Sequence, residues 1–199
     1  MKKERLFFYR FFTPFIKAYF FLKYKPKIYG KENIPEEGAF LACANHIHAF
    51  DQFHIMTQTK RIIHYMAKEE YFEGKFAWFF RNVGCIKVDR RIKDENAKSQ
   101  ALDILNKGGA IGIFPEGTRN KTIGTKDEVP LLPFKFGAVS LAKKSGALII
   151  PFGISGSYKK RGTLVARIGK PIDIKDMELE EANNLLREKI LKLMQNEEK

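Results

Sequence analysis

Short apolar runs and amphipathic segments alternate along this chain. Short apolar runs, which are typical of buried strands, are found at residues 27–30, 38–44, 62–67, 85–88, 110–114, 148–152 and 163–168. Segments with helical spacing or composition lie between and after them, at residues 75–82, 93–107, 134–145 and 179–195. This alternation predicts an α/β fold with a central, largely parallel sheet that is flanked by helices.

The first 25 residues have a different character, because ten of them are Phe or Tyr and seven are Lys or Arg. Arg10 and Lys17 interrupt the apolar runs, so none reaches the roughly 18–20 residues that a spanning helix needs. No cleavage site follows a clean apolar stretch, which argues against a signal peptide. Pro14 predicts two short helices. Basic residues among large rings favour a helix in the membrane interface, and the alternative is a helix packed on the domain with its rings in the core.

The length and charge of the chain limit the remaining possibilities. We expect an N-terminal helical, membrane-docking arm at residues 1–28 and one α/β domain at residues 29–199. A net charge of +13 implies an anionic partner, and the aromatic, basic N-terminus favours a lipid surface. Cys43 and Cys85 lie in apolar stretches without a CxxC pair, so we expect buried thiols in a reducing compartment and no zinc site built on thiolates.

The apolar run 38–44 ends in the sequence NHIHAFD, which places His46 five residues before Asp51. We expect a helix to begin near Phe50 and to carry Asp51 in its first turn, where a carboxylate suits the helix dipole. The turn before this helix can fold so that the carboxylate reaches Nδ1 of His46 and leaves Nε2 free to take a proton. A Gly-x-Ser-x-Gly elbow is absent from the sequence, so the expected nucleophile is a hydroxyl of the substrate.

The neighbouring histidines allow a second interpretation. His48 and His54, with His46 and Asp51, approach the spacing of metal ligands, and only His64 remains for a second set. The order departs from His-x-His-x-Asp-His, because the carboxylate and the last imidazole are displaced. We therefore expect no metal and treat the three additional histidines as ordinary polar or core residues.

Another polar signature follows the apolar run 110–114. It reads Glu116-Gly117-Thr118-Arg119 and combines a glycine-permitted turn, free amides, a hydroxyl and a guanidinium. Such groups can hold a phosphate by charge-assisted hydrogen bonds. A surface Glu–Arg pair after a strand is the alternative interpretation. The run 85–88 leads into further cations at another strand end.

Four blocks of the sequence, in their order along the chain, resemble the 1-acylglycerol-3-phosphate acyltransferases. They lie at residues 45–51, 84–90, 114–119 and 148–153, within the segment 38–156. The resemblance implies that His46 is the general base and that Asp51 orients it. It also implies that Arg90, with Lys87, binds the glycerol-phosphate headgroup, although Lys87 stands where many relatives carry an apolar residue or proline.

The same resemblance implies that Glu116, Gly117, Thr118 and Arg119 form the acceptor-binding loop and that Pro151 shapes the acyl-donor side. The implied reaction moves an acyl chain from a thioester of coenzyme A or acyl carrier protein to the free sn-2 hydroxyl of lysophosphatidate, which gives phosphatidate. No acyl-enzyme and no cofactor are expected. The short, aromatic and basic N-terminus resembles the family's membrane-docking arm, which predicts a peripheral protein on the cytoplasmic face of the cell membrane.

Two other functions remain open at this point. An acyltransferase with the same chemistry could act on a different lysolipid. A non-catalytic basic module that binds membrane or nucleic acid would account for the charge and the aromatic residues. It would not account for an imidazole–carboxylate pair at one strand end and an anion-binding turn at another. The expected partners are therefore lysophosphatidate, the thioester donor and an anionic membrane surface, and not nucleic acid.

Overall fold

The computed structural model describes residues 3–89, 91–92 and 94–196 of the chain. Within these residues, seven strands form one sheet in the spatial order β1-β7-β6-β2-β5-β3-β4. They are β1 (Lys27–Tyr29), β2 (Phe40–Ala44), β3 (Ile63–Lys68), β4 (Ile86–Val88), β5 (Ala110–Ile113), β6 (Leu148–Ser155) and β7 (Val165–Ile168). Five neighbouring strands, from β6 to β4, are parallel, whereas β7 is antiparallel to β6 and β1 is parallel to β7. The predicted α/β fold with a largely parallel sheet is confirmed.

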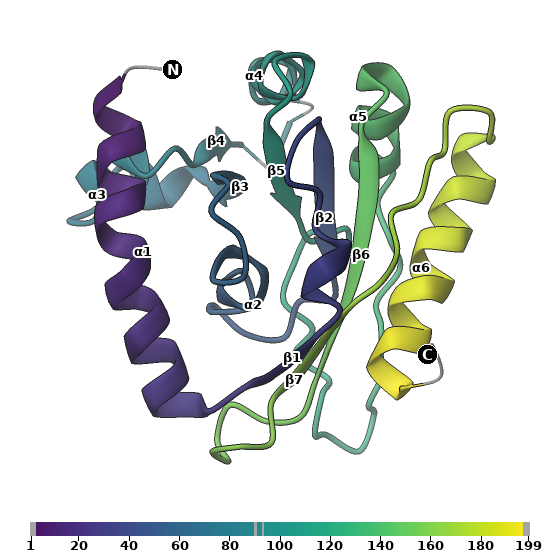
Figure 1. Cartoon of the computed structure of the whole chain (residues 1–199). Helices are drawn as coiled ribbons and strands as arrows, with labels where there is room; N and C mark the ends of the chain where they lie inside the picture. The colour runs from purple at the N-terminus through teal and green to yellow at the C-terminus, as the bar shows by residue number, and fades with distance from the viewer. Residues whose placement is uncertain (1–2, 90, 93, 197–199) are drawn as a thin grey trace.

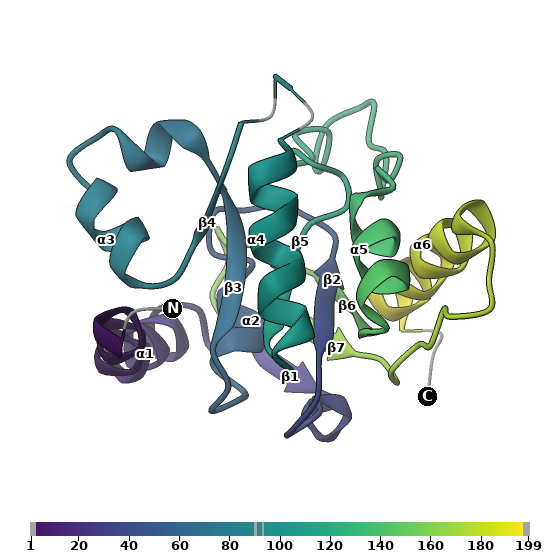
Figure 2. The ribbon, with the colours of Figure 1, turned by 90° about the horizontal axis from the view of Figure 1, so that it is seen from above.

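Helices cover both faces of this sheet. They are α1 (Lys3–Tyr24), α2 (Phe53–Met56), α3 (Ala77–Asn82), α4 (Glu95–Asn106), α5 (Gly137–Ser145) and α6 (Leu179–Gln195), with the short 3-10 turns η1 (Lys31–Asn33) and η2 (Glu69–Phe72). Helices α4, α5 and α6 share one hydrophobic core with the sheet, and α1 and α2 contribute to a second core on the opposite face (Figures 1 and 2). Helix α3 packs against α1.

The central strand β2 explains why the sequence contains an uninterrupted apolar run. All five of its residues have an exposed fraction of 1% or less. Phe40, Ala42 and Ala44 belong to the core beneath α1 and α2, while Leu41 and Cys43 belong to the core beneath α4, α5 and α6. Successive side chains point to opposite faces of a strand, so a strand covered on both sides needs apolar residues at every position. Its carboxyl end leads directly into residues 45–51.

The N-terminal arm is a single helix, which corrects the prediction that Pro14 divides it. A proline inside a helix removes one main-chain hydrogen bond and crowds the preceding turn. In that turn the Thr13 hydroxyl donates to the carbonyl oxygen of Tyr9 at 2.6 Å. Tyr9 and Phe20 are buried on either side of the proline, and their packing against the domain holds both halves of α1 on one helix. The burial therefore outweighs the local cost of the proline.

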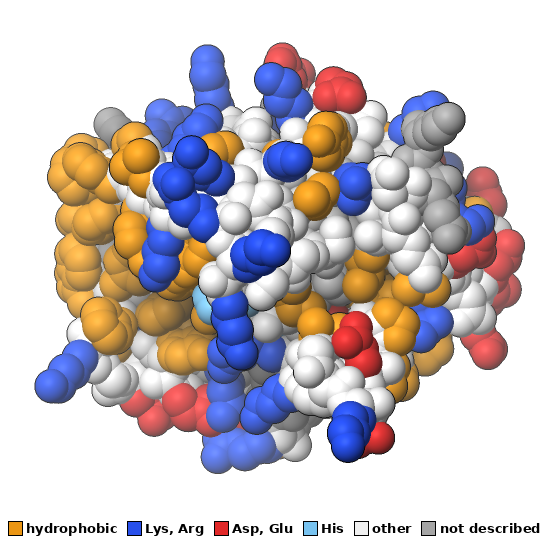
Figure 3. Space-filling model, turned by 90° about the horizontal axis from the view of Figure 1, so that it is seen from below, with side chains coloured by type: hydrophobic (Ala, Val, Ile, Leu, Met, Phe, Trp, Pro, Cys, Tyr) orange, Lys and Arg blue, Asp and Glu red, His pale blue; other side chains and the backbone are white. Residues whose placement is uncertain are grey.

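The outer side of α1 leaves large apolar side chains in solvent. Four of them, which we call the outer stripe, are between 48% and 71% exposed: Phe7, Phe11, Phe15 and Leu22. Figure 3 shows apolar side chains along the edge of the molecule where α1 lies. In the described part of the chain, none of the helices combines the length and the apolar composition that crossing a bilayer requires.

Candidate active site

His46 lies at the carboxyl end of β2, and the main chain around it is tied to β6 and to the segment that follows β5. The Asn45 side chain is 1% exposed; its Nδ2 donates to the carbonyl oxygen of Ile154 at 2.9 Å, and its Oδ1 accepts from the Ile154 N–H at 2.7 Å. The Asn120 N–H donates to the His46 carbonyl oxygen at 2.6 Å. These contacts, from β6 and from the segment after β5, hold in place the main chain that carries the His46 imidazole.

The structure brings Asp51 back onto His46, as the five-residue spacing predicts. Asp51 is fully buried, and its Oδ2 lies 2.8 Å from Nδ1 of His46. The same oxygen accepts the main-chain N–H groups of Ile47 and His48, each at 2.7 Å. One point of the prediction is wrong, because α2 begins at Phe53 and Asp51 precedes it. The carboxylate caps the turn of residues 46–48 and not the helix, since three donors of that turn converge on one oxygen.

The orientation of the His46 ring follows from these contacts. A carboxylate only accepts hydrogen bonds, so Nδ1 must carry the proton and Nε2 holds the lone pair. The ring stacks on Phe114 with a centroid distance of 4.0 Å and an interplanar angle of 9°. The side chain is 15% exposed. Among the described residues no group occupies Nε2, so a ring that is held by Asp51 and by the Phe114 stack can accept a proton there from a bound hydroxyl.

The Glu116 carboxylate connects the two sequence signatures. Its Oε1 accepts the His46 N–H at 2.6 Å, and its Oε2 accepts the Leu132 N–H at 2.9 Å. The residue is 4% exposed, and burial raises the pKa of the carboxyl group above its ordinary value. Both oxygens are thus engaged by the main chain. An additional role of Glu116 in acceptor binding stays a prediction.

The remaining residues of this turn reach solvent. Gly117 has a φ of +70°, a conformation that favours glycine, and Thr118 and Arg119 are exposed. Lys135, which sequence reasoning missed, lies over Gly117: its Nζ is 3.1 Å from the position that a Cβ on Gly117 would take. Burial lowers the pKa of His48; the negative charge of Asp51 opposes this shift, and the positive charge of Arg119 adds to it. Two cations therefore flank a glycine turn beside the histidines.

Tyr158 and His54 are further residues of the site that sequence reasoning missed or assigned elsewhere. The Tyr158 hydroxyl donates to Oδ1 of Asp51 at 2.8 Å, and Nε2 of His54 lies 3.0 Å from the same hydroxyl. Tyr158 follows β6 and is 107 residues from Asp51 in the sequence. No local pattern could indicate this contact, because it depends on how β6 is placed beside β2.

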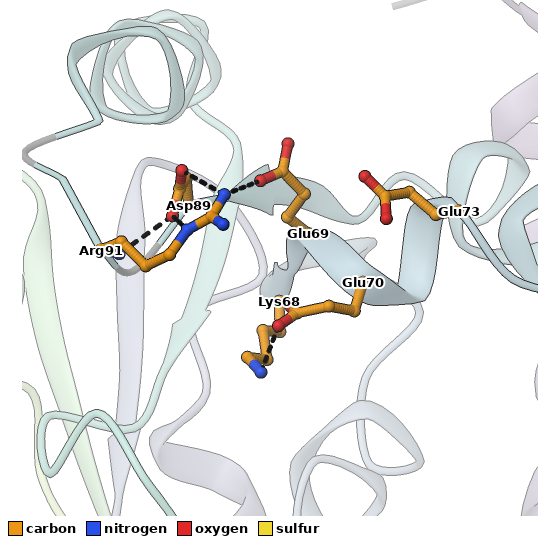
Figure 4. A pocket seen from close by; sticks show the side chains of 6 residues that line it. All are labelled: Lys68, Glu69, Glu70, Glu73, Asp89 and Arg91. Atoms are coloured by element: carbon orange, nitrogen blue, oxygen red, sulfur yellow. Dashed lines mark hydrogen bonds and ion pairs between the residues drawn. The ribbon is translucent and has the colours of Figure 1, made fainter.

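The second predicted phosphate-binding block contains mutually paired charges at the end of β4. Lys87 is exposed, and its Nζ forms an ion pair with Glu69 at 2.7 Å. Arg91 bridges Glu69 at 3.0 Å and Asp89 at 2.9 Å, in a pocket of about 220 Å³ (Figure 4). Hydrogen bonds from Arg91 lower the pKa of Asp89 to about 2. Arg90 lies outside the described residues, so its role and that of Lys87 in headgroup binding stay predictions.

Other predicted residues lie within the sheet or beside it. Pro151 is buried in β6, in register with Cys43 of β2, and its contribution to the acyl-donor side stays a prediction. Nδ1 of His64 lies 2.7 Å from the Gly84 carbonyl oxygen. Cys43 and Cys85 are free thiols, and burial raises the pKa of Cys85 to about 12. Among the residues that the structure describes, no three His, Cys, Asp or Glu side chains are grouped as metal ligands are.

Comparison with known proteins gives a consistent result. The Acyltransferase family model matches residues 25–155. The chain is 31% identical over 174 residues to the 1-acyl-sn-glycerol-3-phosphate acyltransferase of Bacillus subtilis (strain 168), covering 82% of both chains. It is 30% identical over 169 residues to the enzyme of the same name from Saccharomyces cerevisiae, covering 76% of this chain and 52% of the yeast protein.

A solved structure extends the likeness to the fold. The crystal structure of the 1-acyl-sn-glycerophosphate (LPA) acyltransferase PlsC from Thermotoga maritima superposes with a TM-score of 0.72 at 26% sequence identity. The match covers 93% of this chain and 76% of the Thermotoga chain. Together with the family match and the site at the end of β2, these similarities establish that the chain belongs to the acyltransferase family and is an acyltransferase.

Proposed function

We propose that the enzyme transfers an acyl chain from a thioester of coenzyme A or acyl carrier protein to the free sn-2 hydroxyl of lysophosphatidate, which gives phosphatidate. The observation that carries this proposal is the contact between the two signatures. Glu116 of the glycine turn accepts a hydrogen bond from the main chain of His46, whose imidazole is paired with Asp51. The names of the Bacillus and yeast relatives support the same acceptor.

The proposed reaction uses the imidazole as a general base. Nε2 of His46 takes the proton of the sn-2 hydroxyl while the oxygen attacks the thioester carbonyl carbon. The tetrahedral intermediate then expels the thiolate, which takes the proton back from the imidazolium. Asp51 stabilises the imidazolium and holds its tautomer. A positioned base contributes about 10²–10⁴-fold to the rate, and no acyl-enzyme is needed because the substrate supplies the nucleophile.

The glycine turn is proposed to hold the acceptor phosphate. Arg119 and Lys135 supply two cations, and the exposed Thr118 supplies a hydroxyl beside Gly117. Charge-assisted hydrogen bonds from such groups are about twice as strong as neutral ones. In this proposal Glu116 does not touch the phosphate, because both of its oxygens accept main-chain N–H groups. It positions the turn against His46.

Helix α1 is proposed to dock the enzyme on an anionic membrane surface at the cytoplasmic face. The outer stripe supplies apolar rings, and exposed Arg10 and Lys17 lie on the same helix. Figure 3 shows lysine and arginine side chains beside the apolar ones on the face seen from below. Each basic residue near an anionic leaflet contributes about 1 kcal/mol. Each methylene withdrawn from the bilayer costs about 0.8 kcal/mol, so an enzyme that works at the surface avoids extracting its lipid.

A thioester assay on the purified protein tests this proposal. The assay uses lysophosphatidate in anionic vesicles as acceptor, each thioester donor in turn, and product mass as readout. We expect phosphatidate from the wild-type protein and a loss of at least about 10²-fold for His46→Ala, the lower end of the general-base range. Arg119→Gln is expected to raise the acceptor KM. Full turnover by His46→Ala would overturn the mechanism, and transfer to another lysolipid alone would overturn the acceptor.

A further inference from the structure

We infer that Tyr158 and His54 are positioning residues, which hold the Asp51 carboxylate so that it can orient His46. This inference rests on the His46–Asp51 mechanism proposed above. It adds two side chains to the machinery, one from the loop after β6 and one from α2. Neither belongs to the two signatures that point to the reaction.

The two oxygens of Asp51 have unequal surroundings. Oδ2 accepts three hydrogen bonds, all from residues 46–48. For Oδ1, the hydrogen bond found among the described residues comes from the Tyr158 hydroxyl at 2.8 Å. Asp51 is fully buried, so water does not replace a lost donor without rearrangement. The Tyr158 hydroxyl therefore satisfies half of a buried carboxylate and sets its rotation about the Cβ–Cγ bond.

The direction of the hydrogen bonds in this group is determined by chemistry. Asp51 can only accept, so the Tyr158 hydroxyl must donate its proton to Oδ1. The Tyr158 oxygen then has only acceptor capacity left, and the group 3.0 Å from it is Nε2 of His54. His54 must consequently carry its proton on Nε2 and donate it to Tyr158. Both bonds point toward the carboxylate, as a chain of donors that ends on Asp51.

The protonation states of both residues suit permanent donors. Burial raises the pKa of Tyr158 above its ordinary value, and the negative charge of Asp51 raises it further. Burial lowers the pKa of His54 to about 4. At neutral pH, Tyr158 thus keeps its hydroxyl proton and His54 stays a neutral imidazole. Neither residue exchanges protons with the reaction; they orient Asp51.

Packing fixes the rings that carry these donors. The Tyr158 ring stacks on His48 with centroids 3.9 Å apart, and Tyr24 of α1 meets its edge at 5.2 Å. The His54 ring meets Phe20 of α1 edge-on at 4.9 Å. The last two turns of α1 therefore close over the donor chain. A positioning group needs such support, because a loose donor would let the carboxylate rotate.

Several other charged or titratable groups act on this site and belong to any account of its pH dependence. Charged groups that interact electrostatically with Asp51, or with the histidines beside it, are Lys23 of α1 and Glu116 and Arg119 of the loop after β5. Burial raises the pKa of Tyr65 in β3 well above its ordinary value, so this phenol stays uncharged and does not contribute to the acid limb. All of them are retained when the Tyr158 hydroxyl alone is removed. The difference between the wild-type and Tyr158→Phe profiles therefore reports the hydroxyl.

Tyr158→Phe is the test, because it removes the hydroxyl and keeps the ring. Without this donor the Asp51 charge is less stabilised, so the carboxylate protonates more readily and also favours the imidazolium more strongly. Both effects move the acid limb of the kcat profile to higher pH. We expect kcat to fall about tenfold or more, as loss of a hydrogen bond to a charged group predicts, with an unchanged acceptor KM.

Tyr65→Phe is the matched control. Tyr65 also carries a half-buried phenol near the site, but its hydroxyl donates to the Gln52 carbonyl oxygen at 3.2 Å and not to Asp51. We expect its kcat within about threefold of wild type, in line with a neutral hydrogen bond, and an unshifted acid limb. Equal losses in both variants, or an unchanged acid limb in Tyr158→Phe, would overturn the inference. The proposed function fails separately, by turnover that survives His46→Ala.

Variants of His54 provide a second test that does not depend on Tyr158→Phe folding well. His54→Leu removes the donor and is expected to lower kcat, whereas His54→Gln retains a donor near Nε2 and is expected to recover part of it. If His54 acts only through Tyr158, then His54→Leu adds no further loss in the Tyr158→Phe background. Losses that multiply in the double variant, or an equal loss in His54→Gln and His54→Leu, would overturn the proposed chain.

Discussion

Two strand ends of the same sheet carry clusters of charged residues, and they differ in kind. At the end of β2, Asp51 has no exposed surface and accepts four hydrogen bonds between 2.7 and 2.8 Å. At the end of β4, Lys87 and Arg91 pair with carboxylates while their own side chains are 53% and 80% exposed. Both clusters surround a carboxylate with hydrogen-bond donors at the carboxyl ends of parallel strands, but only the cluster at β2 buries its carboxylate fully.

This difference teaches that ion pairing alone does not identify a catalytic strand end. Exposed pairs are screened by water and contribute about 0–1 kcal/mol each, so they can exchange partners freely. A buried carboxylate whose donors are all fixed has one orientation, because any other leaves polar groups unsatisfied. A base that must take a proton along one line needs a buried carboxylate with fixed donors, as at β2. A surface that meets a headgroup can use exposed ion pairs, as at β4.

Asp51→Asn breaks the β2 cluster at its central carboxylate, with an effect second only to loss of the His46 imidazole. The amide can still accept one of the hydrogen bonds at Oδ2, but it lacks the charge that stabilises the imidazolium and holds the tautomer. We expect kcat to fall about 10²–10⁴-fold, as loss of an orienting carboxylate predicts. Asp103→Asn, at an exposed position of α4, is the control and should keep wild-type turnover. Comparable turnover in both variants would contradict the role of Asp51.

Glu116→Gln tests the contact that joins the two signatures. One end of the new amide is a donor and would face a main-chain N–H, either of His46 or of Leu132. We expect the free energy of unfolding to fall by about 1–3 kcal/mol, measured by urea denaturation at pH 8. In Glu128→Gln the changed side chain is exposed and accepts from the Gly124 N–H at 2.9 Å, so the expected change is within about 0.5 kcal/mol. Equal changes would contradict the structural role of Glu116.

The buried His54 makes stability depend on pH. Its pKa is about 4 in the folded protein and about 6.5 in the unfolded chain, so between these values the unfolded state binds the proton. Stability is therefore complete above pH 6.5 and falls as the pH falls, by about 2 kcal/mol at pH 5. His54→Leu should remove this component from the difference between urea unfolding at pH 8 and at pH 5. The wild-type and His54→Leu proteins share His48 and His64, so those residues cancel in the comparison. If the loss of stability between pH 8 and pH 5 is the same in both proteins, His54 is not its source.

The β4 cluster should respond least. Lys87→Gln breaks an exposed pair with Glu69 and is expected to change the free energy of unfolding by less than about 1 kcal/mol. The acceptor KM of the same variant tests whether Lys87 also contacts the lipid headgroup. A rise in KM without loss of kcat would place Lys87 at the headgroup, as the resemblance implies. An unchanged KM would leave the β4 cluster as a solvated surface.

Sequence reasoning located best the strands whose burial can be read from a short run of consecutive apolar residues. Strands β2 and β5 are apolar at every position because both faces are covered, and this pattern needs no knowledge of the fold. Pro14 misled the prediction, because packing of Tyr9 and Phe20 keeps α1 continuous through a residue that usually breaks helices. The prediction of a helix that contains Asp51 failed because its side chain satisfies the preceding turn.

The sequence alone determined the pairing of His46 with Asp51, because five residues and one turn are enough to join them. It also determined that a cation-bearing glycine turn follows a buried strand. The tertiary structure decided which groups complete the site: Tyr158 on the second oxygen of Asp51, and Glu116 beneath the main chain of His46. These contacts span 107 and 70 residues, so they exist only once β6 and β5 lie on either side of β2. Local patterns encode turns and burial; the juxtaposition of distant strands is a property of the folded sheet.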